Sequence, residues 1–228
     1  MINYKLYTAV GSLIVKNGEE GSYPVISLNR TEYPVDPQEA AVWAVLCWRI
    51  CNEEQIRERY ERFVKDMPVE RRTLECCLSR LVTRGLIAKG VGKTKFEALY
   101  DLMGDLYVQP VSDKLSYRLM AFARLLMRGV SVGKAVRLFV RDKPNEQETR
   151  VMALSRQALM STAELIKCVE VGATDVSDDM KLLDALYVDE ETTCDNIAIL
   201  MRTAKSREPV TMAVANLYLR KQVILERV

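Results

Sequence analysis

The chain has 228 residues, of which 49% are hydrophobic and 28% are charged, as in a globular protein with one or two domains. Its formal net charge of +2 is unevenly distributed, because residues 62–95 hold nine basic and three acidic side chains and the remainder is mildly acidic. Histidine is absent, which removes the commonest metal ligand and the commonest general base. We therefore expect no enzyme, no metal site and no cofactor.

Short β-strands are predicted near the N-terminus. Residues 12–16 (SLIVK) and 23–28 (YPVISL) are apolar runs on either side of an Asn17-Gly18 turn signal, which is typical of a β-hairpin. Residues 4–10 are a candidate third strand of that hairpin.

Three helices are predicted next. A capping-box signal formed by Asp36 and Glu39 precedes the apolar segment AAVWAVLCWRI, which is typical of a helix buried at a domain centre. A second capping signal at residues 52–55 begins an amphipathic helix that ends before Pro68. The third helix is predicted over about residues 69–84, with its apolar positions turned inward and Gly85 at its C-terminal cap.

A basic, glycine-containing segment, KGVGKTK, follows the third helix. Residues 96–106 either return as a second strand or begin a helix, and their apolar spacing favours a helix. The best domain boundary is at residues 110–112. Every later element is predicted to be helical, over residues 112–129, 131–140, 151–169, 180–186 and from 209 to the end, and no repeat of fixed period is evident.

Residues 36–95 resemble the winged helix-turn-helix domains of bacterial transcriptional regulators. The resemblance is carried by VWAVLCW and EEQIRERYERF for the first two helices, by RRTLECCLSRLVTRGLIAKG for the third, and by GVGKTK for the wing. It implies a recognition helix at about 69–84 that enters the major groove, and a wing at about 87–96 that touches the neighbouring backbone.

The resemblance also implies the residues that contact DNA. Those placed to approach the groove are Arg71, Arg72, Thr73 and Ser79, and those placed nearer to phosphate are Arg80 and Arg84. The lysines expected at the wing are Lys89, Lys93 and Lys95. The expected function is therefore a DNA-binding transcriptional regulator without catalytic activity.

An alternative uses the same scaffold without DNA. The segment ISLNRTEYPVDPQEAAVWAVL and the ending LSRLVTRGLI also resemble PqqD-like modules, which bind precursor peptides. In such modules the peptide adds a strand to a sheet edge, so the strand at residues 23–28 would matter and the basic helix would face an acidic peptide. The extra residues between Leu28 and Ala40 and the large helical half depart from that family.

The expected fold is mainly α with a small β component. Residues 1–111 are predicted to form a winged helix-turn-helix domain with an N-terminal hairpin, and residues 112–228 a helical domain for association or sensing. Duplex DNA is the expected partner. A homodimer is expected by analogy with two-fold-symmetric regulators, and a small molecule or protein is a candidate effector of the helical domain.

Two further features bear on location. No stretch approaches the roughly 18–20 uncharged apolar residues of a membrane-spanning helix, and the N-terminus lacks a signal-peptide pattern, so a cytoplasmic location without membrane contact is expected. We interpret the six cysteines as reduced side chains that pack as small hydrophobes.

Overall fold

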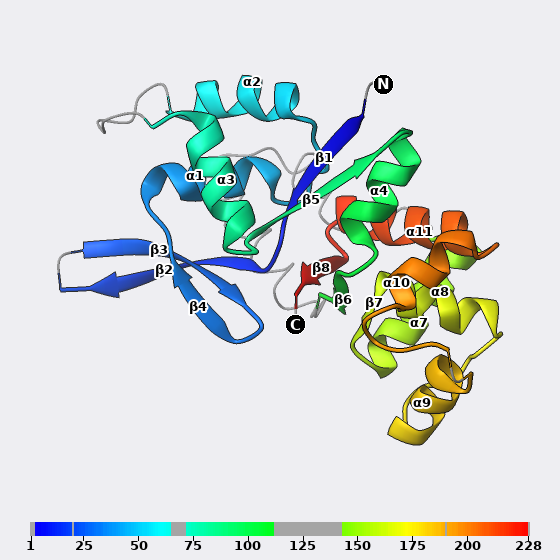
Figure 1. Cartoon of the computed structure of the whole chain (residues 1–228). Coiled ribbons are helices and arrows are strands. Elements are labelled where there is room, and N and C mark those ends of the chain that lie inside the picture. The colour runs from blue at the N-terminus through cyan, green and yellow to red at the C-terminus, as the bar shows by residue number, and fades with distance from the viewer. Residues whose placement is uncertain (1–2, 20, 65–71, 112–142, 190, 228) are drawn as a thin grey trace.

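A computed structural model describes residues 3–19, 21–64, 72–111, 143–189 and 191–227. Over these ranges the chain is mainly helical with small antiparallel sheets, so the predicted class holds at this coarse level (Figure 1). No helix in the described ranges combines the length and the apolar character needed to cross a bilayer. The buried hydrophobic side chains form one contiguous core from Tyr7 to Leu225.

The first unit is built around strand β1 (Tyr4–Ala9). It runs antiparallel to β5 (Ile87–Gly92), and on its other side Tyr7 forms a bridge with Cys51. Helices α1 (Pro37–Leu46), α2 (Glu53–Val64) and α3 (Leu74–Thr83) complete this unit (Figure 1). The predicted capping box at the start of α1 is confirmed.

Helix α3 starts later than predicted within the described residues. The Thr73 hydroxyl accepts a hydrogen bond from the Cys76 N–H and caps the helix, so Leu74 is its first residue and Arg72 lies outside it. The predicted start at about residue 69 lies outside the described residues.

The N-terminal hairpin forms as predicted but has a different third strand. Strands β2 (Ser12–Gly18), β3 (Gly21–Leu28) and β4 (Thr31–Pro34) form a separate sheet in the order β2-β3-β4, which extends away from the helices (Figure 1). The candidate third strand at residues 4–10 is β1, which pairs with β5 instead.

The segment predicted as a wing, 87–96, does not form a wing hairpin. It contains β5 and then the start of α4 (Lys95–Met103), which Thr94 and Glu97 begin with a capping box. The helix packs closely on the strand, because a Cβ atom at Gly90 would lie 2.2 Å from the Ala98 carbonyl oxygen. The two glycines of β5 therefore allow α4 to pack closely against the strand. Of the two expectations for residues 96–106, the helix is the one that forms.

The second half contains strands that the helical prediction missed. Strand β6 (Tyr107–Pro110) lies between β7 (Met160–Ser161) and β8 (Val223–Glu226) in the third sheet. The predicted boundary at residue 111 therefore separates β6 from its two partners. Helices expected over 112–129 and 131–140 lie outside the described residues.

Two of the helices predicted in the second half are longer in the prediction than in the structure, whereas the helix predicted at 180–186 is confirmed as α9 (Asp179–Tyr187). The expected long helix is divided by β7 into α7 (Glu146–Gln157) and α8 (Thr162–Glu170), since Ala158 is extended and Ser161 caps the next helix. After α9 (Asp179–Tyr187), α10 (Ile197–Leu200) and the 3₁₀ turn η2 (Met201–Thr203), α11 (Arg207–Leu219) gives way to β8. We call β6, α7, β7, α8, α11 and β8 the second unit.

Candidate nucleic-acid interface

Helix α3 is amphipathic, and its inner face is as predicted. Its buried side chains are Leu74, Cys77, Leu78 and Leu81. Its exposed side chains are Glu75, Cys76, Ser79, Arg80 and Thr83. Cys76, Ser79 and Thr83 follow one another at helical spacing, so they form one solvent-facing stripe of short side chains, which we call the α3 stripe.

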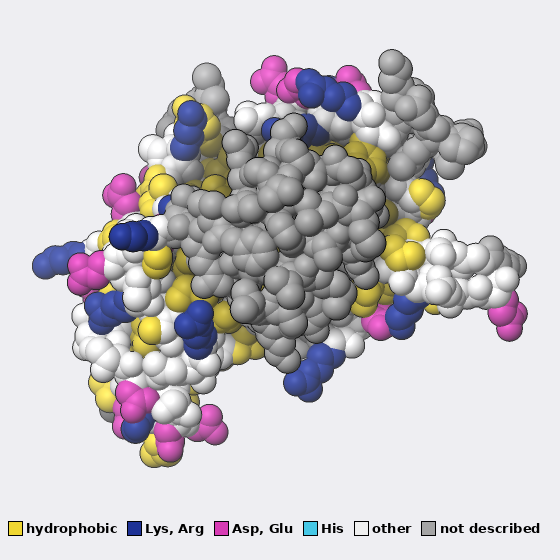
Figure 2. Space-filling view, turned by 180° about the vertical axis from the view of Figure 1, so that it is seen from behind, with side chains coloured by type: hydrophobic (Ala, Val, Ile, Leu, Met, Phe, Trp, Pro, Cys, Tyr) yellow, Lys and Arg dark blue, Asp and Glu magenta, His cyan; other side chains and the backbone are white. Residues whose placement is uncertain are grey.

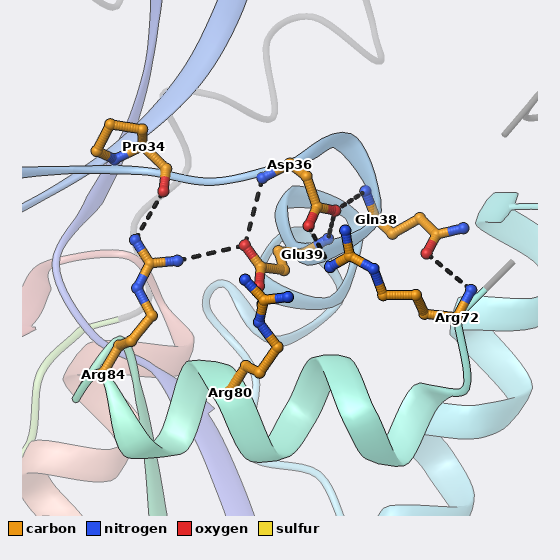
Figure 3. A network of polar contacts seen from close by, with 7 residues as sticks. All are labelled: Pro34, Asp36, Gln38, Glu39, Arg72, Arg80 and Arg84. Carbon is orange, nitrogen blue, oxygen red and sulfur yellow. Dashed lines mark hydrogen bonds and ion pairs between the residues drawn. The ribbon is translucent and has the colours of Figure 1, made fainter. Parts of the chain in front are cut away.

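Arg72 is bound to the start of α1 (Figure 3). Its Nη1 lies 2.6 Å from Asp36 Oδ2, and its backbone N–H donates to Gln38 Oε1 at 3.1 Å. Burial raises the pKa of Asp36, but hydrogen bonds from the Glu39 and Gln38 N–H groups and from Arg72 outweigh it and hold the pKa below its ordinary value. The Asp36 carboxylate thus links α1 to the segment that leads into α3.

Arg80 and Arg84 converge on one buried carboxylate (Figure 3). The Glu39 side chain is only 2% exposed, and its oxygens lie 2.9 Å from Arg80 Nε and 3.3 Å from Arg84 Nη1. Arg84 also donates to the Pro34 carbonyl oxygen at 2.6 Å and lies over the Tyr33 ring. A buried carboxylate needs such partners, so these arginines compensate the burial of Glu39.

The three arginines differ in how far they remain open to solvent. The side chain of Arg84 is 29% exposed, whereas those of Arg72 and Arg80 are 41% and 51% exposed. Arg84 is therefore foremost a structural residue that joins α3 to α1 and β4. Arg72 and Arg80 keep donor groups that can meet an anion beside the α3 stripe.

The remaining predicted contacts are dispersed. Arg71 lies outside the described residues. Thr73 serves as the N-cap of α3, and Ser79 is exposed. The exposed Lys89 lies on β5 opposite Tyr7, while Lys93 and Lys95 flank the start of α4. The structure thus brings Arg72, Arg80 and Arg84 together and places the three lysines on other elements.

Acidic side chains neutralise part of the positive charge of the basic segment, and these ion pairs were not predicted from the sequence. Asp36 and Glu39 were interpreted only as a helix start, and the Arg57–Glu75 ion pair, at 2.5 Å between α2 and α3, was not foreseen. No local pattern reveals such pairs, because their partners are 18 to 45 residues apart along the chain. They leave the α3 face less positive than the sequence count suggests.

Around the residues that are not described, charges of both signs are intermixed on the face seen from behind. Figure 2 shows lysine and arginine side chains of the described residues scattered among acidic and hydrophobic ones, without a continuous basic stripe. Within the described ranges no group of three or more His, Cys, Asp or Glu side chains is placed to hold a metal ion.

The hairpin presents a second surface. Strand β3 is central, so the segment 23–28 predicted as a binding edge pairs with β2, and its residues from Val25 onward pair with β4 as well. Strands β2 and β4 are the two outer strands, and on β2 the side chains of Leu13, Ile14 and Val15 are 36%, 41% and 66% exposed. Comparisons of the chain with protein-family models, with curated proteins and with solved structures found no match.

Proposed function

We propose that this protein binds duplex DNA through α3 and acts as a transcriptional regulator in the cytoplasm, on a winged-helix-like first unit. The observation that carries the proposal is the α3 stripe, flanked by the half-exposed guanidinium groups of Arg72 and Arg80. Short side chains allow a helix to approach base edges closely, and serine and threonine hydroxyls hydrogen-bond to bases and phosphates alike.

Phosphate contacts in this proposal come from arginines that already have partners. Exposed ion pairs contribute only about 0–1 kcal/mol, so Arg72 can exchange Asp36 for a phosphate oxygen at little cost. Arg80 keeps the buried Glu39 and offers its remaining donor groups to phosphate. Arg84 stays with Glu39 and orients α3. Since no wing hairpin forms at 87–96, Lys93 and Lys95 add only long-range attraction.

The test is fluorescence anisotropy of a labelled random-sequence duplex titrated with the protein at two salt concentrations. We expect binding that weakens between roughly 50 and 200 mM salt, because phosphate contacts release counterions. With few phosphate contacts the salt dependence is expected to be shallow. No binding at the lower salt concentration would refute the proposal.

A second candidate function is peptide binding by strand addition. It is favoured by the outer edge of β2, whose exposed Leu13, Ile14 and Val15 are unusual for a strand that ends a sheet. Titration with a labelled acidic peptide tests it. Capture that Val15→Lys abolishes, with no duplex binding at all, would support this function over DNA binding.

A homodimer remains part of the proposal by analogy with regulators that read two half-sites. Light scattering coupled to size exclusion measures it directly. A monomer at micromolar concentration in the presence and absence of duplex would contradict it.

A further inference from the structure

The two units share one order of elements. Apart from β2–β4 after the first strand of the first unit and α9, α10 and η2 before the third helix of the second, the first unit runs β1, α1, the bridge at Cys51, α2, α3, β5, and the second runs β6, α7, β7, α8, α11, β8. In each, the first strand lies in the middle. Tyr7 of β1 lies opposite both Cys51 and Lys89, and Val108 of β6 lies opposite both Met160 and Leu225.

The helix starts repeat at constant spacing. The capping box of Asp36 and Glu39 at α1 has its counterpart in Asn145 and Glu148 at α7. The reciprocal hydrogen bonds of Asn52 and Gln55 before α2 have theirs in Ser161 and Glu164 before α8. Each of the four residues is separated from its counterpart by the same number of positions.

The end of the third helix repeats as well. Arg84 is the C-cap of α3 and pairs with Glu39, and Arg220 is the C-cap of α11 and pairs with Glu148 at 2.7 Å. Glu39 and Glu148 are both almost fully buried. The next residue has a positive φ in each case, 73° at Gly85 and 62° at Lys221.

These matches align α3 with α11 residue by residue. The inner positions agree, since Leu74, Cys77, Leu78 and Leu81 and their counterparts Val210, Ala213, Val214 and Leu217 are all buried. The outer positions differ. Glu75 and Ser79 are exposed, whereas their counterparts Thr211 and Ala215 are 0% and 3% exposed.

The buried side of α11 faces the first unit. One turn beyond Ala215, the Tyr218 hydroxyl accepts hydrogen bonds from the Thr8 hydroxyl at 2.9 Å and the Trp48 N–H at 3.0 Å. The Tyr218 and Trp48 rings lie 5.4 Å apart. The exposed positions of α11 include Met212 and Leu219, which are the apolar counterparts of Cys76 and Thr83 on α3.

We infer that the chain contains two copies of one structural unit with different roles: the first presents its third helix to DNA, and the second uses the side of its own third helix that carries Thr211, Ala215 and Tyr218 to hold the first. This inference rests on the proposed function. It implies that α3 is the DNA-reading helix among those that the structure describes, and that α11 makes no base contacts. A chain of this kind therefore reads one half-site.

Two matched variants test the division of roles. Cys76→Glu and Met212→Glu place the same charge at equivalent, exposed positions of α3 and α11. In the full chain we expect Cys76→Glu to weaken binding of the labelled duplex about tenfold or more, because the new carboxylate repels phosphates. We expect Met212→Glu to change it less than about twofold, as a distant surface charge does.

Thr83→Glu and Leu219→Glu form a second matched pair in case one variant fails to fold, which circular dichroism detects. Equal weakening by both members of a pair, or weakening by the α11 member alone, would overturn the inference and leave DNA binding intact. Duplex binding that neither member of either pair changes would also overturn the inference. A wild-type chain that binds no duplex at all would overturn the proposed function and the inference together.

Discussion

Helices α3 and α11 occupy the same place in two units of the same design, yet they differ along one outer side, which is exposed in α3 and buried in α11. Their inner faces and C-caps match, and in both units a buried glutamate joins the first helix to the third. What differs is the outer face, where the exposed Ser79 is matched by the buried Ala215. The inner face and the caps therefore specify this unit, whereas the outer side of the third helix is free to acquire either a ligand or an intramolecular partner.

Tyr218→Ala should have the largest effect, because it removes the main polar and aromatic contact between the units. We expect a loss of about 3–5 kcal/mol in the free energy of unfolding, as for other buried aromatic residues. Both tryptophans, Trp43 and Trp48, belong to the first unit, so urea unfolding followed by tryptophan fluorescence reports on it. If that transition does not move, the second unit does not support the first.

The paired variants Glu39→Gln and Glu148→Gln test whether the two buried glutamates contribute equally to stability. Each removes a buried carboxylate charge that pairs with the arginine at the C-cap of the third helix, so each should cost about 2 kcal/mol. Thermal or urea unfolding measures both. A large cost for one variant and none for the other would show that the two pairs are not equivalent.

The positive φ after each third helix gives a pair of opposite predictions. Gly85→Ala should destabilise the protein by about 1 kcal/mol, because an alanine is strained there, although its Cβ would meet only ordinary contacts. Lys221→Gly should stabilise the protein by a similar amount, since it relieves that strain. Changes of the same sign would contradict this account of the two C-caps.

The smallest effect concerns pH, because the N-cap of α1 titrates and that of α7 does not. The pKa of Asp36 is lowered in the folded protein, so its contribution is fully present above the unfolded value of about 3.9 and is lost as pH falls through the folded value. Asp36→Asn copies Asn145 of the second unit. This variant should lose less stability than the wild type between about pH 5 and pH 2, as measured by urea unfolding. An unchanged pH dependence would assign acid sensitivity to other carboxylates.

Local signals in the sequence were sufficient for some elements. The capping box at Asp36, the turn at Asn17-Gly18 and the inner stripe of α3 could all be predicted, because each depends on residues close together in the chain. Strand β7 could not, since two residues such as Met160 and Ser161 carry no periodicity and their pairing with β6 is set by tertiary contacts.

The repeat and the ion pairs were hidden for a related reason. Residues 65–73 separate α2 from α3, whereas residues 171–206, which include α9 and α10, separate α8 from α11, so no fixed period survives. The net positive charge of the basic segment was overestimated, because Asp36 and Glu39 reach Arg72, Arg80 and Arg84 only in the folded chain.

The central claim, that DNA meets α3 and not the second unit, is tested most directly by two native cysteines. Cys76 lies on the α3 stripe, and Cys194 lies between α9 and α10, in the segment that joins α8 to α11 of the second unit; both are exposed, while the other four cysteines are buried or partly buried. We would measure alkylation of each thiol by mass spectrometry with and without saturating duplex. We expect bound duplex to slow the alkylation of Cys76 and to leave the alkylation rate of Cys194 unchanged. Protection of Cys194 with Cys76 still reactive would contradict it.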